Sequence, residues 1–145
     1  MKIVVDTNIL FSAHLNPSGI IGKYFTLGRE QLQFIAPAFL LFELKKHEVK
    51  LQKLSKLSNQ DFLILTQLLL SNVRFIAEEE ISETSFSLAE KLVDDIDSNY
   101  ILFVALALEY ETNLWTGDKK LKAGLLKKNF KNLINTKELE DLLNK

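Results

Sequence analysis

Two kinds of hydrophobic pattern alternate along the chain. Short apolar runs, bounded by polar or turn-forming residues, predict buried strands at residues 2–5, 32–36, 73–76, 112–115 and 133–134. Between these runs, apolar residues recur every three or four positions, as they do on one face of an amphipathic helix. The helical segments are expected to begin near residues 8, 20, 38, 58, 82, 101, 119 and 136.

This alternation predicts the fold class. Each predicted strand is too apolar to face water, so helices must cover both faces of the sheet that the strands form. Strands that are connected through helices run parallel to one another. We therefore predict an α/β fold with a central parallel sheet, organised as one domain over residues 1–145.

The longest predicted helix spans about residues 38–56, after Pro37, and Ser58 is expected to cap the next one. Gly28 is expected to end the helix that begins near residue 20. Five leucines of the long helix form one apolar stripe: Leu40, Leu41, Leu44, Leu51 and Leu54.

Composition narrows the classes of protein and site. The chain has no cysteine, which excludes disulfides, thiolate zinc sites and cysteine nucleophiles, and which suits a reducing, cytoplasmic location. Asp6 interrupts the first apolar run, and no run reaches the length of a membrane span, so we expect neither a signal peptide nor a membrane segment. The net charge of −1 says nothing about partners.

The distribution of charge says more than its sum. Six lysines lie between Lys119 and Lys131 without an intervening acid, whereas residues 78–83 and 94–97 are acidic. Such asymmetry can mark a nucleic-acid track beside a metal pocket. A solvated helix face explains it equally well.

Two aspartates follow predicted strands at widely separated points of the chain. Asp6 ends the first apolar run, and Asp118 follows Leu114 and Trp115. In open α/β folds, ligands bind at the carboxyl edge of the sheet, where both aspartates would lie. Two acids that meet there repel one another unless a cation lies between them, and hard divalent cations prefer oxygen ligands. The pattern therefore predicts a metal-dependent enzyme.

Two further acidic segments are ambiguous when each is taken alone. Glu43 stands in the otherwise apolar stretch of residues 39–44, where the edge of a polar helix face is the simpler explanation. Acids at positions 94, 95 and 97 precede an apolar helix, where they would complement the helix dipole. Together with Asp6 and Asp118, however, four separate elements would each direct an acid to the same sheet edge.

At this point the chain resembles the PIN-domain nucleases. The resemblance rests on four segments in the family's order and spacing: Val5-Asp6-Thr7-Asn8-Ile9-Leu10, Pro37 with Leu41-Phe42-Glu43-Leu44, Asp95-Ile96-Asp97 before Phe103–Leu108, and Trp115-Thr116-Gly117-Asp118-Lys119. The resemblance implies a three-layer α/β/α sandwich, an Asp/Glu cluster that binds Mg²⁺ or Mn²⁺, and hydrolysis of phosphodiester bonds in RNA. Many members are the toxins of toxin–antitoxin pairs, and others process RNA.

The family's functional positions map onto this chain with one departure. Its acidic positions correspond to Asp6, Glu43 and Asp118, and its small polar positions, which orient the carboxylates, to Thr7, Asn8 and Thr116. A further acid usually stands about five residues before the alanine that matches Ala105, but here Tyr100 occupies that position. A phenol stays protonated near neutral pH and is a poor ligand for a hard cation. Either Asp97 or a bridging water would then take its role, and Asp95 is a weaker candidate.

We therefore expect a divalent-metal-dependent endoribonuclease of single-stranded RNA. Asp6, Asp97 and Asp118 would hold the ion, and Glu43 would hold a second ion or act as general base. The RNA-contacting candidates are Lys119 and Lys120, with Lys46 weaker because it, like His47, is explained more simply by a solvated helix side. An antitoxin protein and a second copy of the chain are the expected protein partners.

Other functions remain open or are excluded by particular residues. Haloacid-type phosphatases need a second aspartate at the position of Asn8, and receiver domains need adjacent acids at the end of the first strand. Neither pattern is present. The alternative that remains is a catalytically impaired PIN-like module, disabled at Tyr100, that binds RNA or protein.

Overall fold

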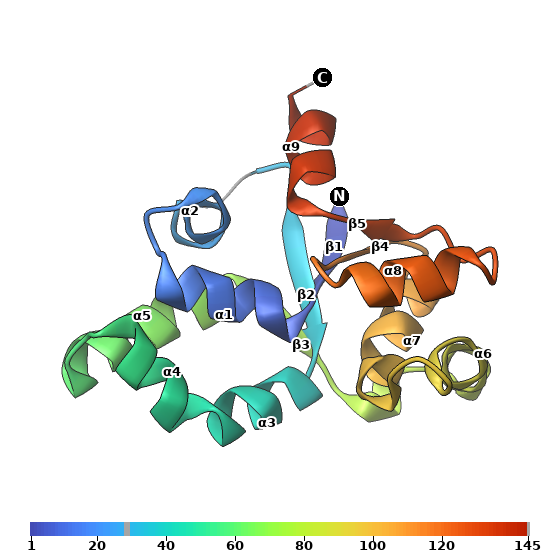
Figure 1. Ribbon diagram of the computed structural model, residues 1–145, viewed down its shortest axis with the longest axis horizontal. Helices are drawn as coiled ribbons and strands as arrows, with labels where there is room; N and C mark the ends of the chain where they lie inside the picture. The colour runs from blue at the N-terminus through green and yellow to red at the C-terminus, as the bar shows by residue number, and fades with distance from the viewer. Residues whose placement is uncertain (28–29, 145) are drawn as a thin grey trace.

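The centre of the protein is a five-stranded parallel sheet (Figure 1). The computed structural model describes residues 1–27 and 30–144. The strands are β1 (Lys2–Val5), β2 (Gln33–Pro37), β3 (Val73–Ile76), β4 (Asn113–Trp115) and β5 (Leu133–Ile134), in the spatial order β3-β2-β1-β4-β5. Each predicted strand is present, within one residue at either end.

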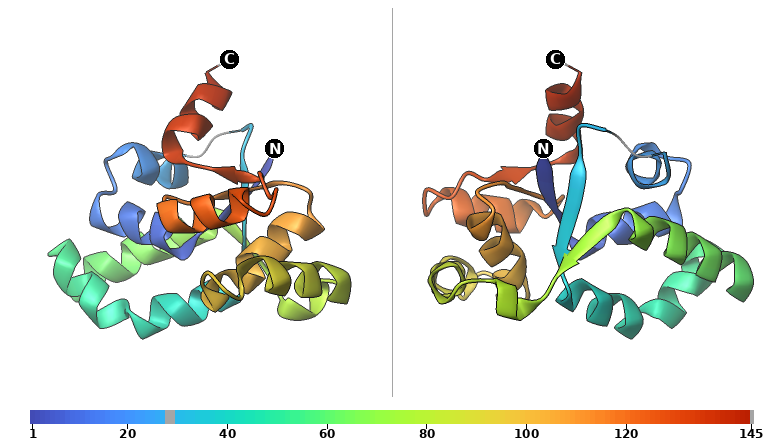
Figure 2. Two further views of the ribbon diagram at one scale, coloured as in Figure 1. Left: turned by 45° about the vertical axis from the view of Figure 1, so that its right-hand side comes forward. Right: turned by 180° about the vertical axis from the view of Figure 1, so that it is seen from behind.

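Helices cover both faces of the sheet, as Figures 1 and 2 show. On one side lie α1 (Thr7–Leu15), α2 (Ile20–Thr26), α3 (Phe39–Lys46), α4 (Glu48–Ser55) and α5 (Asn59–Ser71). On the other lie α6 (Glu83–Val93), α7 (Ile101–Glu109) and α8 (Lys119–Leu126). Two short 3₁₀ helices, η1 (Glu78–Glu80) and η2 (Ser98–Tyr100), and a final helix, α9 (Thr136–Leu143), complete the described elements. The predicted α/β/α sandwich is confirmed.

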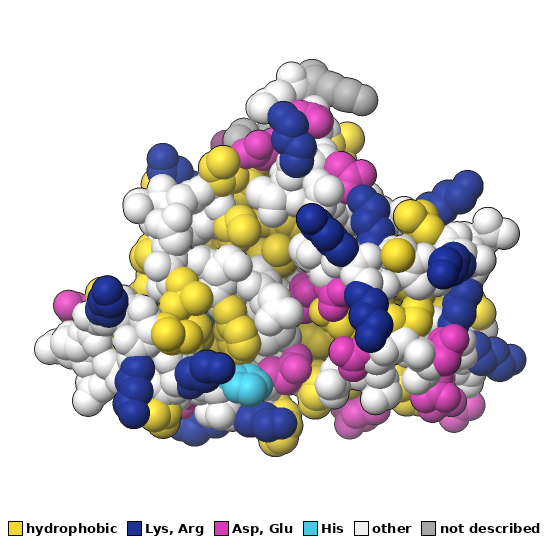
Figure 3. Space-filling model, in the orientation of Figure 1, with side chains coloured by type: hydrophobic (Ala, Val, Ile, Leu, Met, Phe, Trp, Pro, Cys, Tyr) yellow, Lys and Arg dark blue, Asp and Glu magenta, His cyan; other side chains and the backbone are white. Residues whose placement is uncertain are grey.

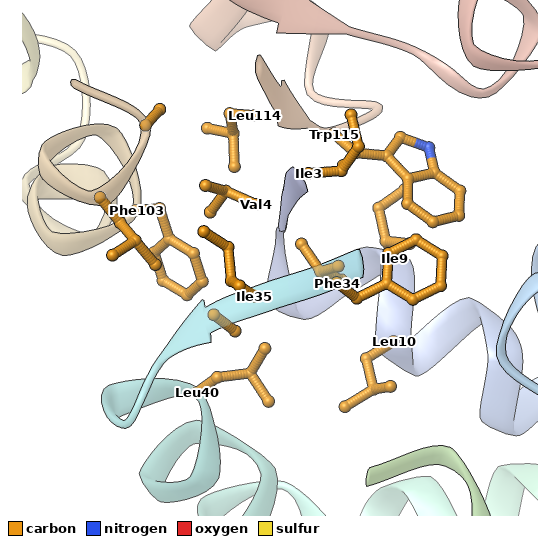
Figure 4. Close-up of a cluster of buried hydrophobic side chains, with 14 of the residues drawn as sticks. Ile3, Val4, Ile9, Leu10, Phe34, Ile35, Leu40, Phe103, Leu114 and Trp115 are labelled. Carbon is orange, nitrogen blue, oxygen red and sulfur yellow. The ribbon is translucent and has the colours of Figure 1, made fainter. Parts of the chain in front are cut away.

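The core forms where the sheet meets its helices (Figure 4). Ile3, Val4 and Val5 of β1 are fully buried, as expected for a central strand that is covered on both faces. Trp115, also fully buried, stacks on Phe25 of α2 with ring centroids 5.8 Å apart and an angle of 8° between the ring planes. None of the helices in the described part of the chain has both the length and the apolar character needed to cross a membrane.

The prediction of one long helix over residues 38–56 was wrong. The segment forms two helices, α3 and α4, that meet at His47, whose backbone angles are φ −103° and ψ 7°. The bend keeps its hydrogen bonds, because the His47 N–H donates to the Glu43 carbonyl and the Leu51 N–H to the His47 carbonyl. A single straight stripe cannot stay on the core through this bend. Of its five leucines, Leu41 and Leu54 are 39% and 57% exposed.

Capping predictions fared better. The Ser58 hydroxyl accepts a hydrogen bond from the Asp61 N–H at 3.1 Å and caps α5 as expected. Pro37 is the last residue of β2 rather than a helix start, and α3 begins at Phe39. Gly28, the expected end of the helix that begins at residue 20, lies outside the described residues.

The strand order determines where the functional side chains meet. The chain runs from the central strand β1 to β2 and β3 on one side, and later returns to β4 and β5 on the other. The carboxyl ends of β1 and β4 are neighbours, since Val5 is paired with Trp115 and the Asp6 N–H donates to the Trp115 carbonyl at 3.1 Å. This is the point at which strand order reverses, where open α/β sheets bind their ligands.

Candidate active site

Asp6 ends β1 and caps α1, and its carboxylate is almost completely buried. Its Oδ2 atom accepts a hydrogen bond from the Thr116 hydroxyl at 2.6 Å, and its Oδ1 atom accepts from the Asn8 N–H at 3.4 Å. Thr116 directly follows β4, so the two neighbouring strand ends supply both partners. Asn8 participates through its backbone.

Burial raises the pKa of the Asp6 carboxyl above its ordinary value. The hydrogen bonds from Thr116 and Asn8 lower this pKa, whereas the negative charges of Glu43 and Asp118 raise it further. The net upward shift of the pKa arises mainly because the buried carboxylate has lost its contact with water. A cation beside Asp6 would reduce this shift.

Asp118 caps α8, and the hydroxyl of Tyr100 lies between its carboxylate and that of Asp6. Its Oδ1 atom accepts from the Leu121 N–H at 2.9 Å, and its own N–H donates to the Thr116 hydroxyl oxygen at 3.1 Å. The Tyr100 hydroxyl lies 2.8 Å from Asp118 Oδ2 and 3.4 Å from Asp6 Oδ2. Both carboxylates therefore face one phenolic oxygen.

Burial also raises the pKa of the Tyr100 phenol, and the charge of Asp6 and the hydrogen bond to Asp118 add to this shift. The phenol consequently stays protonated and acts as a hydrogen-bond donor. A neutral hydroxyl group therefore stands at position 100, where the resemblance implied an acid.

Glu43 belongs to α3 and is half-buried. Its Oε1 atom accepts a hydrogen bond from the hydroxyl of the buried Thr7 at 2.6 Å, so the residue after Asp6 holds the carboxylate of a distant helix. The expectation that Glu43 points toward the sheet edge agrees with this contact.

These groups surround an open cavity of about 180 Å³ at the carboxyl edge of the sheet. Figure 3 shows acidic side chains around a hollow near the centre of this face, with basic side chains close by. Three expected acids, Asp6, Glu43 and Asp97, line the cavity, together with Thr7, Asn8, Phe11, His47, Asn99, Tyr100 and Phe103. Asp118 is connected to this set through Tyr100.

Asp97 and Asp95 differ in their surroundings. Asp97 is exposed, caps η2 by accepting from the Asn99 N–H at 3.0 Å, and lines the cavity. Asp95 is also exposed but forms an ion pair with Lys128 of the segment after α8, and it is not among the residues that line the cavity. The structure therefore brings Asp97, but not Asp95, to the other acids.

The expected RNA-contacting lysines all lie at the surface. Lys119 and Lys120 are exposed in the first turn of α8, immediately after Asp118. Lys46 is exposed at the end of α3, beside His47.

The donor set fits a hard divalent cation in its chemistry. Asp6 and Asp118 supply oxygens that face one phenolic oxygen, and burial, with a smaller contribution from the charges of Glu43 and Asp118, raises the pKa of Asp6. Among the described residues, no three His, Asp or Glu side chains are arranged to hold one metal ion. Mg²⁺ commonly keeps several waters and uses only one or two carboxylates together with substrate phosphates, so a pair of carboxylates agrees with its usual protein ligands.

A model of the PIN domain matches residues 4–139. The chain belongs to the PIN-domain family. The match includes every acid of the cavity and all five strands except the first residues of β1. It confirms the resemblance that the sequence motifs indicated.

Two further similarities agree with this membership. The uncharacterized protein MJ1680 of Methanocaldococcus jannaschii is 33% identical over 124 residues, which cover 83% of this chain and 73% of the relative. A solved structure of VapBC2 from Rickettsia felis, bound to a DNA fragment from their promoter, matches with a TM-score of 0.69 and 18% identity. That match covers 93% of this chain and 98% of the VapBC2 chain, and at this identity it shows a shared fold.

Some residues of this PIN domain are more closely associated with the cavity than their sequence context indicates. His47 was better explained as part of a solvated helix side, yet it lines the cavity with its ring edge-on to Phe11 at 5.8 Å. Asn99 was not identified at all. The available signal was proximity along the chain, since His47 lies one helical turn after Glu43 and Asn99 directly precedes Tyr100.

Proposed function

We propose that this chain is a divalent-metal-dependent endoribonuclease that hydrolyses phosphodiester bonds of single-stranded RNA. One observation carries the proposal: Asp6, at the end of β1, and Glu43, on α3, line one cavity at the point where strand order reverses, and the Tyr100 hydroxyl connects Asp118, at the start of α8, to them. In a PIN domain this combination favours nuclease chemistry over simple binding.

The chain's own residues have distinct roles in this proposal. Asp6 and Asp118 would hold Mg²⁺ or Mn²⁺, with Asp97 and Glu43 as further candidates, and the ion would supply positive charge that stabilises the phosphate in the transition state. The Thr116 hydroxyl donates to the Asp6 carboxylate and fixes its position, and the backbone N–H of Asn8 donates to the same carboxylate. Thr7 orients Glu43, which would hold a second ion or act as the general base that removes a proton from the attacking water.

The test is a cleavage assay with a circular single-stranded RNA, which only an endonuclease can open. We expect cleavage that requires Mn²⁺ or Mg²⁺ and stops in EDTA. D6N and D118N should each reduce the rate by roughly 10²–10³-fold, the scale on which a single charge-stabilising group contributes. Asp61→Asn, the same change at an exposed position in the first turn of α5, is a matched control and should leave the rate unchanged.

The Tyr100 contacts favour one alternative, a PIN-like module that binds RNA or protein without cleaving it. The Tyr100 hydroxyl lies between Asp6 and Asp118, where a cation would otherwise reduce the repulsion between the two carboxylates. RNA that is bound but remains intact at every concentration of Mn²⁺ and Mg²⁺ would establish this alternative.

A more specific form of the proposal is the toxin of a toxin–antitoxin pair, acting in the cytoplasm. Two features support it: the resemblance to a family rich in such toxins, and an apolar groove between α3, α4 and α5 that could accept a protein. Leu41, Val49 and Leu63 line this groove and are 39%, 70% and 56% exposed. Expression of the chain alone should arrest growth, and co-expression with a small antitoxin-like reading frame adjacent to its gene should relieve the arrest. Light scattering of the purified chain would establish whether it forms a homodimer.

A further inference from the structure

Tyr100 makes the most unusual contacts of the acidic cavity. Its hydroxyl lies within hydrogen-bond reach of both Asp118 Oδ2, at 2.8 Å, and Asp6 Oδ2, at 3.4 Å. A phenol has one proton and donates to one acceptor at a time. The shorter distance assigns this proton to Asp118, while Asp6 lies at the outer limit of a hydrogen bond.

The tyrosine ring is held firmly in this position. Tyr100 is 7% exposed, and its ring packs edge-on to Phe103 with centroids 6.3 Å apart. Its backbone N–H donates to the Asp97 carbonyl at 3.1 Å, at the junction between η2 and α7. This packing places the hydroxyl beside the two carboxylates.

The same point in space suits a cation. Asp6 and Asp118 face the phenolic oxygen from two different strand ends, and a divalent ion that used both would need to approach their Oδ2 atoms to 2.0–2.6 Å. Without an ion, two neighbouring carboxylates repel one another, and a hydroxyl group that donates to Asp118 reduces that repulsion by drawing charge from one of the two. The hydroxyl group thus lies beside the same two oxygens that the ion would contact.

We propose that the Tyr100 hydroxyl, by donating to Asp118, stabilises the neighbouring Asp6 and Asp118 carboxylates in the metal-free protein and that a divalent cation must displace this hydrogen bond to bind both carboxylates. Tyr100 is then a positioning residue that stabilises the metal-free protein and lowers its affinity for a divalent cation. The inference rests on the metal binding proposed above.

Tyr100→Phe isolates this effect, because it removes only the hydroxyl and keeps the ring against Phe103. The metal-free variant should melt at a lower temperature than wild type in EDTA, since Asp118 loses its donor. Its affinity for Mn²⁺ should rise, because the ion no longer competes with a hydrogen bond. A hydrogen bond to a charged group corresponds to roughly 10- to 100-fold in an equilibrium constant.

Calorimetric titration of Mn²⁺ into wild type, Tyr100→Phe and Tyr110→Phe tests the proposal. Tyr110 is half-buried at the end of α7, with its ring below the Lys2 ammonium group, and is the matched control. Tighter binding by Tyr100→Phe alone supports the inference. A second readout is the NMR spectrum of ¹³C-labelled tyrosine, in which Mg²⁺ should shift the Tyr100 signal and leave the Tyr110 signal unchanged.

The outcomes separate this inference from the proposed function. If wild type binds Mn²⁺ and Tyr100→Phe binds it equally or more weakly, the inference is wrong and the metal-dependent nuclease stands. If metal-free Tyr100→Phe melts at the same temperature as metal-free wild type, the hydrogen bond does not stabilise the Asp6 and Asp118 carboxylates, and the inference is again wrong. If none of the three proteins binds Mn²⁺, the metal site and the inference are both overturned.

Discussion

Thr116 connects the two aspartates of the site through a single hydroxyl group. The group donates to Asp6 Oδ2 at 2.6 Å and accepts from the Asp118 N–H at 3.1 Å. Because the residue is buried, water cannot replace either bond when the hydroxyl is removed. The position of the Asp6 carboxylate and that of the Asp118 backbone therefore both depend on this one side chain.

Thr116→Val should lower the free energy of unfolding by about 1.5–3 kcal/mol, the range for a hydrogen bond to a charged group. The change also removes the contact that lowers the pKa of Asp6, so this pKa should rise further. Urea unfolding in EDTA measures the loss, and Thr116→Ser, which keeps the hydroxyl, is the control. Equal stability of the Val and Ser variants would contradict this role.

At the residue scale, sequence located the acids well because each follows a local signal. Asp6 and Asp118 stand where an apolar run ends, and the structure brings both to one edge. The position of Tyr100 was identified as a departure from the family, but its two hydrogen bonds were not predicted. They depend on where η2 places the ring relative to strands far away in the chain, which no local pattern contains.

At the element scale, Asp118 has a structural role as well as its proposed chemical one, since it caps α8. Asp118→Ala removes the cap and the charge, whereas Asp118→Asn keeps a good cap and removes only the charge. In EDTA the Ala variant should be less stable than the Asn variant by about 1 kcal/mol. Both variants should lose calorimetric Mn²⁺ binding. An Ala variant as stable as the Asn variant would show that the cap contributes nothing.

The contact between α1 and α5 predicts a pH dependence. His14 is buried, its Nδ1 lies 3.1 Å from the Leu10 carbonyl and its Nε2 lies 3.0 Å from the Thr66 hydroxyl. Burial lowers the pKa of this imidazole from 6.5, so the unfolded chain takes up a proton more readily than the folded one. Stability should therefore fall as the pH drops below about 6.5.

His14→Gln should weaken this fall in urea-unfolding midpoints between pH 7 and pH 5, although the variant is less stable overall. Lys53→Gln, an exposed change on α4, is the control and should retain the wild-type pH dependence. The same slope in His14→Gln and wild type would assign the effect to another group.

The helices also show why periodicity predicts where a helix lies better than it predicts which of its residues are exposed. The pattern identified the segment that contains α3 and α4 as helical, but not the bend at His47. An apolar residue at helical spacing can face the core or an uncovered groove, and Leu41 lines such a groove. Hydrophobicity alone does not distinguish these two surroundings.

At the scale of the whole molecule, charge is distributed around the cavity in a way that refines the expected RNA track. Two of the six lysines after Asp118 are paired, Lys122 with Glu138 and Lys128 with Asp95. Lys119 and Lys120 are exposed at the start of α8, beside the acids. These two are therefore the best placed to contact an RNA backbone that enters the site.

The double variant K119E/K120E should bind single-stranded RNA more weakly and with less dependence on salt. Each lost phosphate contact reduces the slope of log K against log salt by about 0.7, so two should reduce it by about 1.4. The double variant K127E/K131E has the same change in net charge at exposed positions beyond the far end of α8, and is the matched control. Fluorescence anisotropy of labelled RNA in EDTA, across a series of salt concentrations, measures both slopes without cleavage. If the two double variants lose affinity and slope equally, net charge alone attracts the RNA and no track begins at Asp118. A smaller slope in K119E/K120E alone would instead place the RNA backbone at the start of α8, next to the carboxylates proposed to cut it.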